Sequence, residues 1–245
     1  MKGVILAGGR GTRLGLMTKV VNKHLLPVYD RPMIMYPIAT LKSMGITSIM
    51  IVTDKSRAGD FMNLLGSGRE FGVHFTYGLQ DNAAGIADAI SISKDFAGSE
   101  SITVILGDNI FIDFSTEAQS MPNYAKIFLT KVDEPERFGV VHVLDGKIVD
   151  IIEKPKEHVS NLAVTGLYQY PPDVFHLIDN LSPSERKELE VTALNKEFLK
   201  LNRLDFEIID SYWIDAGTVE SLFEAQMKIR NHTVENSSKN EVRIK

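Results

Sequence analysis

Glycines and basic residues that could hold a phosphate follow the first apolar run of the chain. Val-Ile-Leu at residues 4–6 predicts a buried strand, and three glycines follow within residues 8–11. Glycines at this position let the backbone approach a ligand and point its N–H groups at anionic oxygens. Arg13 adds a guanidinium suited to phosphate, and Lys23 adds an ammonium ten positions later. A tight strand-to-helix turn explains the glycines equally well, and the two cations favour a phosphate site.

Two well-known glycine-rich phosphate loops do not fit these residues. A Walker loop ends in Gly-Lys-Ser/Thr, whereas this run ends in Gly-Thr-Arg. The dinucleotide fingerprint requires a third glycine three positions after the second, and that position is Leu14. A dehydrogenase is therefore disfavoured, and the sequence predicts a phosphate-binding loop of a third kind.

Carboxylates follow two further predicted strands. The apolar run 102–106 ends in Gly-Asp108-Asn, and the run 212–214 ends in Asp215-Ala-Gly. Ligands of open α/β sheets bind beyond the carboxyl ends of the strands, so these residues predict a site for a hard cation that shares phosphate oxygens. Each aspartate alone is more often a helix cap or a turn residue than a metal ligand.

The elements that must position these residues alternate through the first half. Strands are expected at 2–7, 48–53, 74–78 and 102–106, and helices at 32–44, 57–65 and 85–97. This alternation is typical of a mostly parallel sheet covered on both faces. The second half predicts strands at 125–132, 139–144, 147–153, 163–170 and 212–215, with helices at 171–180, 190–201 and 217–231. Since no linker separates the halves, we expect them to share one sheet, followed by a polar tail over 232–245.

Composition restricts the function. The net charge of −5 argues against a broad nucleic-acid surface. The absence of cysteine excludes disulfides, thiolate catalysis and cysteine-ligated zinc, and the six histidines show no metal-ligand spacing. No apolar run has the length of a signal-peptide core or a membrane span. We therefore expect a cytoplasmic protein with neither nucleic acid nor membrane as a partner.

Seven motifs in order resemble the sugar-1-phosphate nucleotidyltransferase family, from Lys2 to about Ile229. They are LAGGRGTRL, KHLLPVYDRPMI, LGDNIF, ERFGVV, EKPK, AVTGLY and WIDAGT. The resemblance implies an α/β fold: a three-layer α/β/α nucleotide-diphospho-sugar transferase (Rossmann-like) fold with a predominantly parallel, mixed central sheet. It implies a single domain over 1–231, with a nucleotide-binding half (about 1–110) and a sugar-phosphate-binding half (about 111–231). It also implies a homo-oligomer, either a dimer or a tetramer.

The same resemblance implies a reaction and its residues. Mg²⁺-dependent transfer of a thymidylyl group from dTTP to α-D-glucose 1-phosphate would give dTDP-glucose and pyrophosphate. The expected catalytic residues are Arg13, Lys23, Asp108 and Lys154. The expected nucleotide contacts are Leu6, Ala7, Gly8, Gly9, Gly11, Thr12, Arg13, Lys23, Gln80, Gly85 and Asp108. The expected sugar-phosphate contacts are Asn109, Phe138, Gly139, Glu153, Lys154 and Val164, and the expected Mg²⁺ ligands are Asp108 and Asp215.

No general base is needed for this chemistry, because a sugar phosphate is mostly dianionic at neutral pH and is already a nucleophile. Positioning and cationic stabilisation supply most of such catalysis. Two alternatives stay open: a UTP-using or other hexose-1-phosphate nucleotidyltransferase, since one methyl group separates thymine from uracil, and a non-catalytic nucleotide-sugar binding module. Phe138 stands where the family commonly has tyrosine, and Ala216 where it commonly has threonine.

Overall fold

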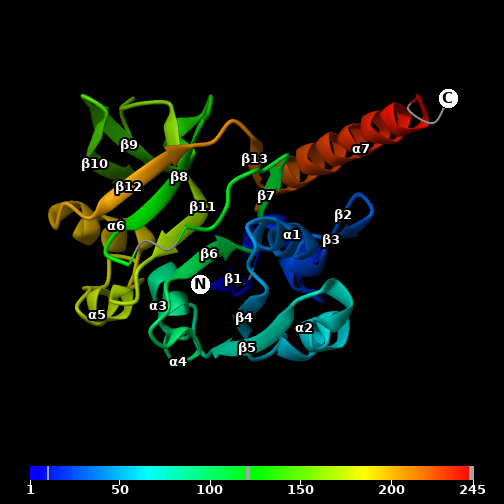
Figure 1. The fold of residues 1–245 in the computed structure, drawn as a ribbon, viewed down its shortest axis with the longest axis horizontal. Helices are drawn as coiled ribbons and strands as arrows, with labels where there is room; N and C mark the ends of the chain where they lie inside the picture. The colour runs from blue at the N-terminus through cyan, green and yellow to red at the C-terminus, as the bar shows by residue number, and fades with distance from the viewer. Residues whose placement is uncertain (10, 120–121, 243–245) are drawn as a thin grey trace.

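The computed structural model describes residues 1–9, 11–119 and 122–242 and is built around a nine-stranded mixed sheet (Figure 1). Its first half consists of the parallel strands β1 (Lys2–Leu6), β4 (Ser48–Asp54), β5 (His74–Gln80) and β6 (Ile102–Leu106). The strand order is β10 (Lys147–Glu153), β9 (Gly139–Leu144), β11 (Leu162–Tyr170), β6, β1, β4 and β5. All four predicted strands of this half are confirmed, so the carboxyl ends of β1, β4 and β6 point to one edge of the sheet.

The second half extends the same sheet with antiparallel strands. They are β8 (Ala125–Lys131), β9 (Gly139–Leu144), β10 (Lys147–Glu153) and β11 (Leu162–Tyr170). Strand β11 pairs antiparallel with β6, which confirms that the two halves share one sheet. Strand β12 (Leu204–Ile208), which the sequence analysis missed, pairs parallel with β8 at the outer edge.

Helices cover both faces of the sheet, which confirms the three-layer prediction. Along β1, Val4 and Leu6 face one side and Ile5 the other, as the alternation of side chains in a strand requires. The first face packs against α3 (Ile86–Ser91), α4 (Lys94–Ala97), α5 (Val174–Asp179) and α6 (Val191–Lys200). The second packs against α1 (Met35–Ser43) and α2 (Ala58–Leu65).

Two predicted helices of the first half differ from the structure. The helix expected at 32–44 begins only at Met35, because β3 (Arg31–Pro32) pairs with β2 (Pro27–Val28) as a small hairpin. The helix expected at 85–97 is divided into α3 and α4, where the Ser93 hydroxyl donates to the Ile90 carbonyl at 2.7 Å. Such a side-chain hydrogen bond competes with the helical backbone pattern. Short 3₁₀ turns occupy Thr12–Thr18, Lys23–Leu25, Arg69–Phe71 and Pro135–Arg137.

A separate two-stranded sheet joins distant parts of the chain. Strand β13 (Tyr212–Asp215) was predicted, but it pairs antiparallel with the unpredicted β7 (Asn109–Ile112) and does not enter the main sheet. Asp215 therefore does not end a strand of the central sheet, which corrects the expectation from the sequence. Its partner in the register is Asn109, so Asp215 lies beside Asp108 all the same.

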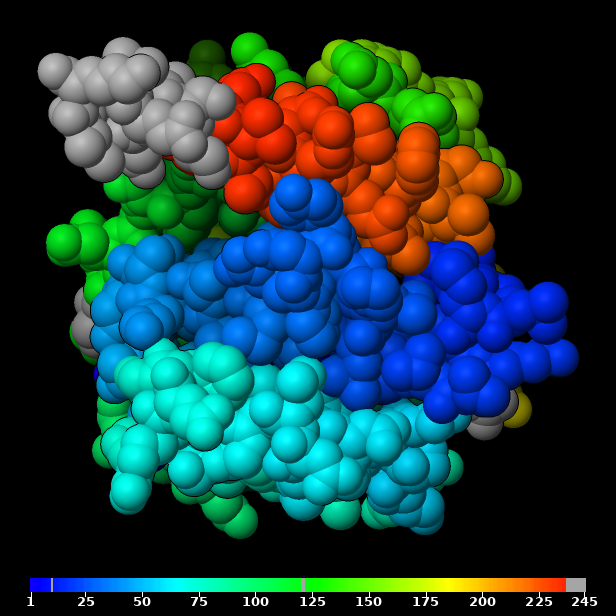
Figure 2. All heavy atoms as spheres, turned by 90° about the vertical axis from the view of Figure 1, so that its right-hand side faces the viewer, coloured from blue at the N-terminus to red at the C-terminus, as the bar shows by residue number. Residues whose placement is uncertain are grey.

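The long helix α7 (Val219–Val242) projects from the body of the molecule (Figure 1). Thr218 and Ser221 cap its start reciprocally, each hydroxyl accepting from the other residue's backbone N–H at 3.1 Å. Figure 2 shows α7 lying across the region of α1, β2 and β3, and the Gln226 amide donates to the Pro27 carbonyl at 3.2 Å. The predicted end of this helix at residue 231 is wrong, because the helix continues to Val242 through much of the expected tail. Across the described ranges, no helix has both the length and the apolarity to cross a membrane.

Candidate active site

A cleft of about 380 Å³ runs along the boundary between the two halves, at the carboxyl ends of the strands. Predicted site residues that line it are Leu6, Gly8, Gly9, Arg13, Lys23, Gln80, Gly85, Asp108, Phe138, Gly139, Glu153, Lys154, Val164 and Asp215. Ala7, Gly11, Thr12 and Asn109 do not belong to this lining. The fold thus brings most of the predicted site residues, from both halves, into one cavity.

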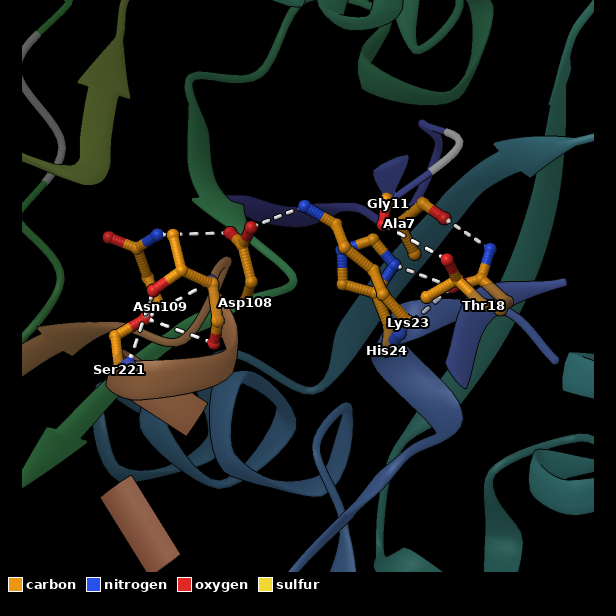
Figure 3. Close-up of polar contacts among 10 residues, drawn as sticks. Ala7, Gly11, Thr18, Lys23, His24, Asp108, Asn109 and Ser221 are labelled. Carbon is orange, nitrogen blue, oxygen red and sulfur yellow. Dashed lines mark hydrogen bonds and ion pairs between the residues drawn. The ribbon is translucent and has the colours of Figure 1, made fainter. Parts of the chain in front are cut away.

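The glycine-rich loop connects β1 to the turn that carries Lys23. Gly11 has a φ of +60°, and a Cβ there would lie 2.9 Å from Cγ2 of Thr18 and 3.1 Å from Cβ of Lys23. Only glycine adopts this conformation readily and leaves space for both neighbours. The Thr18 hydroxyl donates to the Gly11 carbonyl at 2.9 Å and closes the loop (Figure 3). Gly11 therefore allows the glycine-rich loop to pack closely against the turn that carries Lys23.

Lys23 and Asp108 form an ion pair at the centre of the cleft. The Lys23 ammonium donates to Oδ2 of Asp108 (Figure 3), and the side chains are only 14% and 9% exposed. Burial by itself would raise the pKa of Asp108, but the charge of Lys23 and its hydrogen bond hold that pKa well below its usual range. Asp108 is therefore a carboxylate throughout the physiological pH range.

Asp215 stands next to this pair with an unsatisfied oxygen. The Ala216 N–H donates to the Asp108 carbonyl at 2.9 Å, which joins the two acidic segments. Burial and the negative charge of Asp108 raise the pKa of Asp215 to about 6. Within the described chain, its buried Oδ1 has no hydrogen-bond partner. A Cβ on Gly217 would lie 2.8 Å from this oxygen and 2.9 Å from Nη2 of Arg13, so glycine there leaves room for both groups.

These two carboxylates fit a divalent cation of the Mg²⁺ type. A free buried carboxylate oxygen beside a second carboxylate supplies the hard ligands that Mg²⁺ prefers. Among the residues that the structure describes, no group of three or more His, Cys, Asp or Glu could form an all-protein cage. Mg²⁺ commonly binds one or two carboxylates and takes its remaining ligands from water and substrate phosphate. Asp108 and Asp215 are therefore sufficient on the protein side.

Asn109 lies behind Asp108, and protein partners occupy its side chain. Its Oδ1 accepts from the Gly166 N–H at 2.8 Å and from Nε1 of Trp213 at 2.6 Å, while its Nδ2 donates to Oδ1 of Asp108 at 3.1 Å. Sequence reasoning assigned Asn109 to the sugar phosphate. These contacts fix the orientation of the Asp108 carboxylate, and the sugar-phosphate contact of Asn109 stays a prediction.

The other end of the cleft is built from β9, β10 and α6. The Thr192 hydroxyl donates to Oε2 of Glu153 at 2.7 Å, and the Lys154 ammonium lies 3.7 Å from Oε1 of Glu153. Lys154 has a φ of +46°, unusual for a residue with a side chain, and its N–H donates to the Phe138 carbonyl at 2.9 Å. Such strained residues cluster at functional sites. Glu153 and Lys154 offer a carboxylate for hydroxyl groups and a cation for phosphate.

Sequence reasoning missed the segment 182–190, which crosses between the halves. Its backbone is hydrogen-bonded to the start of α3: the Leu189 N–H donates to the Ala84 carbonyl at 2.7 Å, and the Ala87 N–H donates to the Leu189 carbonyl at 3.0 Å. This contact brings further lining residues, namely Arg186, Glu188, Glu190, Val191, Thr192 and Asn195. A charged run between two helices gives no local signal for a contact about 100 residues away. The remaining missed lining residues are His24, Ala83, Ile86, Ala89, Leu106, Arg137 and Tyr168.

Comparison with known proteins identifies the family of this chain. A family model described as nucleotidyl transferase matches residues 2–232. The chain belongs to this family. Accordingly, it is a nucleotidyltransferase enzyme with the nucleotide-diphospho-sugar transferase fold that the motifs predicted.

Several named relatives of this nucleotidyltransferase cover almost its whole length. A glucose-1-phosphate thymidylyltransferase of Neisseria meningitidis is 41% identical over 96% of this chain and 84% of the relative, and one of Mycolicibacterium smegmatis is 40% identical over 94% and 82%. A crystal structure described as a glucose-1-phosphate thymidylyltransferase from Bacillus anthracis with sucrose bound has a TM-score of 0.87 and 48% identity, covering 94% of this chain and 95% of its own. A UDP-glucose pyrophosphorylase in complex with UDP-glucose has a TM-score of 0.82 and 25% identity, covering 94% and 98%.

Proposed function

We propose that this nucleotidyltransferase transfers a thymidylyl group from dTTP to α-D-glucose 1-phosphate, with release of pyrophosphate. The thymidylyltransferase relatives support this substrate pair, at 40–48% identity over nearly the whole chain. The observation that carries the proposal is the arrangement at the centre of the cleft, where the Lys23–Asp108 pair lies beside the free Oδ1 of Asp215 and near Arg13. Two polyanions can meet only where such positive charge is held in place.

The cations bind different phosphates according to their positions in the cleft. Arg13 and Lys23, next to the glycine-rich loop, bind the triphosphate of the nucleotide. Lys154 binds the phosphate of the sugar, and Glu153 accepts hydrogen bonds from sugar hydroxyls. The sugar phosphate is already a dianion and attacks the α-phosphorus in line, so positioning and charge stabilisation lower the barrier. Asp108 and Asp215 would hold Mg²⁺, which when bound neutralises charge on the phosphate oxygens.

Initial rates of pyrophosphate release test this assignment. We expect turnover with dTTP and α-D-glucose 1-phosphate in the presence of Mg²⁺, and its loss when EDTA removes the metal. The panel includes dTTP, UTP, CTP and ATP, each with glucose, galactose and mannose 1-phosphates. The similarity to a UDP-glucose pyrophosphorylase favours UTP as the second nucleotide, and one methyl group separates it from dTTP by about 1–3 kcal/mol. No release with any pair would contradict the proposal and leave a binding module.

We propose in addition that the protein works as a dimer or tetramer of identical chains. Light scattering of the purified protein tests this assembly, and a monomeric mass at micromolar concentration would contradict it. A cytoplasmic location stays a prediction from the sequence.

A further inference from the structure

Gln80 ends β5, and uncharged residues at the start of α3 line the cleft beside it. It is buried, and the lining residues next to it on α3 and its approach are Ala83, Gly85, Ile86 and Ala89. The cations Arg13, Lys23 and Lys154 gather around the two carboxylates and the sugar-phosphate end instead. Because phosphates require the cations, the nucleobase belongs at the Gln80 end.

Asp88 on α3 fixes the orientation of the Gln80 amide. Nε2 of Gln80 donates to Oδ2 of Asp88 at 2.7 Å and points its second hydrogen towards the Gly85 carbonyl at 3.4 Å. A carboxylate can only accept hydrogen bonds, so the amide nitrogen must face Asp88. An amide carries two hydrogens on its nitrogen, and both are directed at protein acceptors. Gln80 therefore has no donor left for a ligand.

The oxygen of the same amide is the group that remains for a ligand. A Cβ on Gly8 would lie 3.0 Å from Oε1 of Gln80, so this oxygen lies against the glycine-rich loop and within the cleft lining. In the part of the chain that the structure describes, no protein donor is hydrogen-bonded to Oε1. Gln80 thus offers the cleft one acceptor in a fixed direction.

We infer that Asp88 is a positioning residue that sets nucleobase selection through Gln80. This inference rests on the proposed function, because it assumes a pyrimidine nucleotide in the cleft. Thymine and uracil carry an N3–H donor that matches a fixed acceptor. Cytosine carries an unprotonated N3 at the same position, so its lone pair faces the lone pairs of Oε1. The structure thus favours imide bases over cytosine, and Asp88 maintains this preference without touching the base.

The variant Asp88→Leu tests the inference, with Asp88→Asn as its matched control. Leucine keeps the approximate size of the side chain but removes the acceptor, so Gln80 can rotate its amide and offer its nitrogen to cytosine. We expect the ratio of kcat/KM for dTTP to kcat/KM for CTP to fall at least tenfold in Asp88→Leu. Asparagine keeps a carbonyl that accepts from Nε2, and its ratio should stay within about threefold of the unmodified protein. Equal losses for dTTP and CTP in Asp88→Leu would overturn the inference and show a structural role.

Measurements in the Gln80→Ala variant separate a positioning role of Asp88 from a role in folding. In Gln80→Ala, Asp88 has no amide to orient, so adding Asp88→Leu should leave the dTTP-to-CTP ratio unchanged. If the ratio falls further in the double variant, Asp88 acts by another route and the inference is wrong. This comparison holds even where Asp88→Leu lowers the stability of the protein, because each ratio compares two nucleotides in the same variant.

Calorimetric binding of the Mg²⁺ complexes of dTTP and CTP distinguishes this inference from the proposed function. Tighter binding of dTTP, lost in Asp88→Leu, supports the inference even in a protein that transfers nothing. Equal affinities in the unmodified protein overturn it, whatever the rate of transfer.

Discussion

Lys23 and Asp108 depend on each other because both are removed from water. A buried ion pair gains little over an apolar pair, but removal of one partner leaves an uncompensated charge that costs about 3–5 kcal/mol. Lys23 lies on a short turn, where a lysine would ordinarily be solvated and contribute little to stability. Its side chain instead reaches into the cleft to meet Asp108. The same contact therefore contributes to the fold and holds Lys23 in the position from which the proposed function has it bind phosphate.

We expect Lys23→Met to lower activity and stability together. Loss of one cation from a phosphoryl-transfer site costs about 10²–10⁵ in kcat, and the unpaired Asp108 should lower the free energy of unfolding by about 3 kcal/mol. Adding Asp108→Asn should restore most of the stability but none of the activity. Urea denaturation and pyrophosphate release measure the two effects. An unchanged urea midpoint in Lys23→Met would show that the ion pair is not formed.

Asp215→Asn should separate metal binding from folding. We expect turnover to fall at least about 100-fold at fixed Mg²⁺, since an amide lacks the charge that a hard cation requires. Without Mg²⁺, the melting temperature should rise, because burial beside Asp108 makes the ionised form of Asp215 unfavourable at pH 7, as its raised pKa indicates. Asp113→Asn is the control, because Asp113 is exposed and paired with His232 outside the cleft. Near-normal activity in Asp215→Asn would remove this residue from the metal site.

Gly85, at the start of α3, packs against segment 182–190. The resemblance implied that Gly85 contacts the nucleotide. A Cβ there would lie 2.4 Å from the Leu189 carbonyl oxygen, and the φ of +110° is itself unfavourable for other residues. The glycine therefore allows the crossing of segment 182–190 over the start of α3. The contact between Gly85 and Leu189 alone requires glycine at this position.

We accordingly expect Gly85→Ala to displace segment 182–190 and with it Arg186. The change should lower the melting temperature by several degrees and lower kcat/KM for both substrates, because the crossing holds the cleft walls together. Gly59→Ala is the control, since a Cβ at this helical glycine meets nothing within 4 Å. Limited proteolysis locates the effect, with faster cleavage expected within 182–190. Unchanged cleavage together with weaker nucleotide binding would contradict this role and indicate that Gly85 acts by direct contact with the nucleotide.

The elements that the sequence predicted well are those with strong local patterns. The continuous apolar runs of β1, β4 and β6 identify buried strands. Asp145-Gly146 is typical of a hairpin turn, and it joins β9 to β10 with both residues at positive φ. Strand β7 was missed because Asn109 follows so closely on the end of β6. The pairing of β13 with β7 has no local signal at all. Motifs predicted the charged lining residues Arg13, Lys23, Asp108, Glu153, Lys154 and Asp215. They did not predict Arg137, Arg186, Glu188 or Glu190, and the last three belong to segment 182–190, whose contact with α3 sequence spacing does not reveal.

The cleft lies between two halves of the molecule that share one continuous sheet. The β6–β11 pairing crosses the boundary directly beneath the site. The residues that line the cleft come from both halves, and neither half can unfold without breaking the β6–β11 strand pair. We expect a single cooperative unfolding transition for the chain.

Ligand binding should raise the temperature of this single unfolding transition. The product complex, dTDP-glucose with Mg²⁺ at 100 times its Kd, should stabilise the folded protein by about 2.7 kcal/mol. For a chain of this size, this corresponds to a rise in Tm of roughly 5–10 °C. Differential scanning calorimetry measures the shift, and the same titration with EDTA is the control. Two separate transitions, only one of which moves, would contradict a shared folding unit.

The small sheet formed by β7 and β13 also sets an order of events during synthesis. Asn109 and Asp215 face each other in its register, although about 100 residues separate them along the chain. At 5–20 residues per second, a ribosome needs about 5–20 s to bridge this interval. Lys2–Leu6, Lys23 and Asp108 have all emerged by then, and the parallel half can begin to assemble around them. Asp215 arrives only with the last part of the described chain, so a nascent protein completes this cleft late, after most of the sheet has been synthesised.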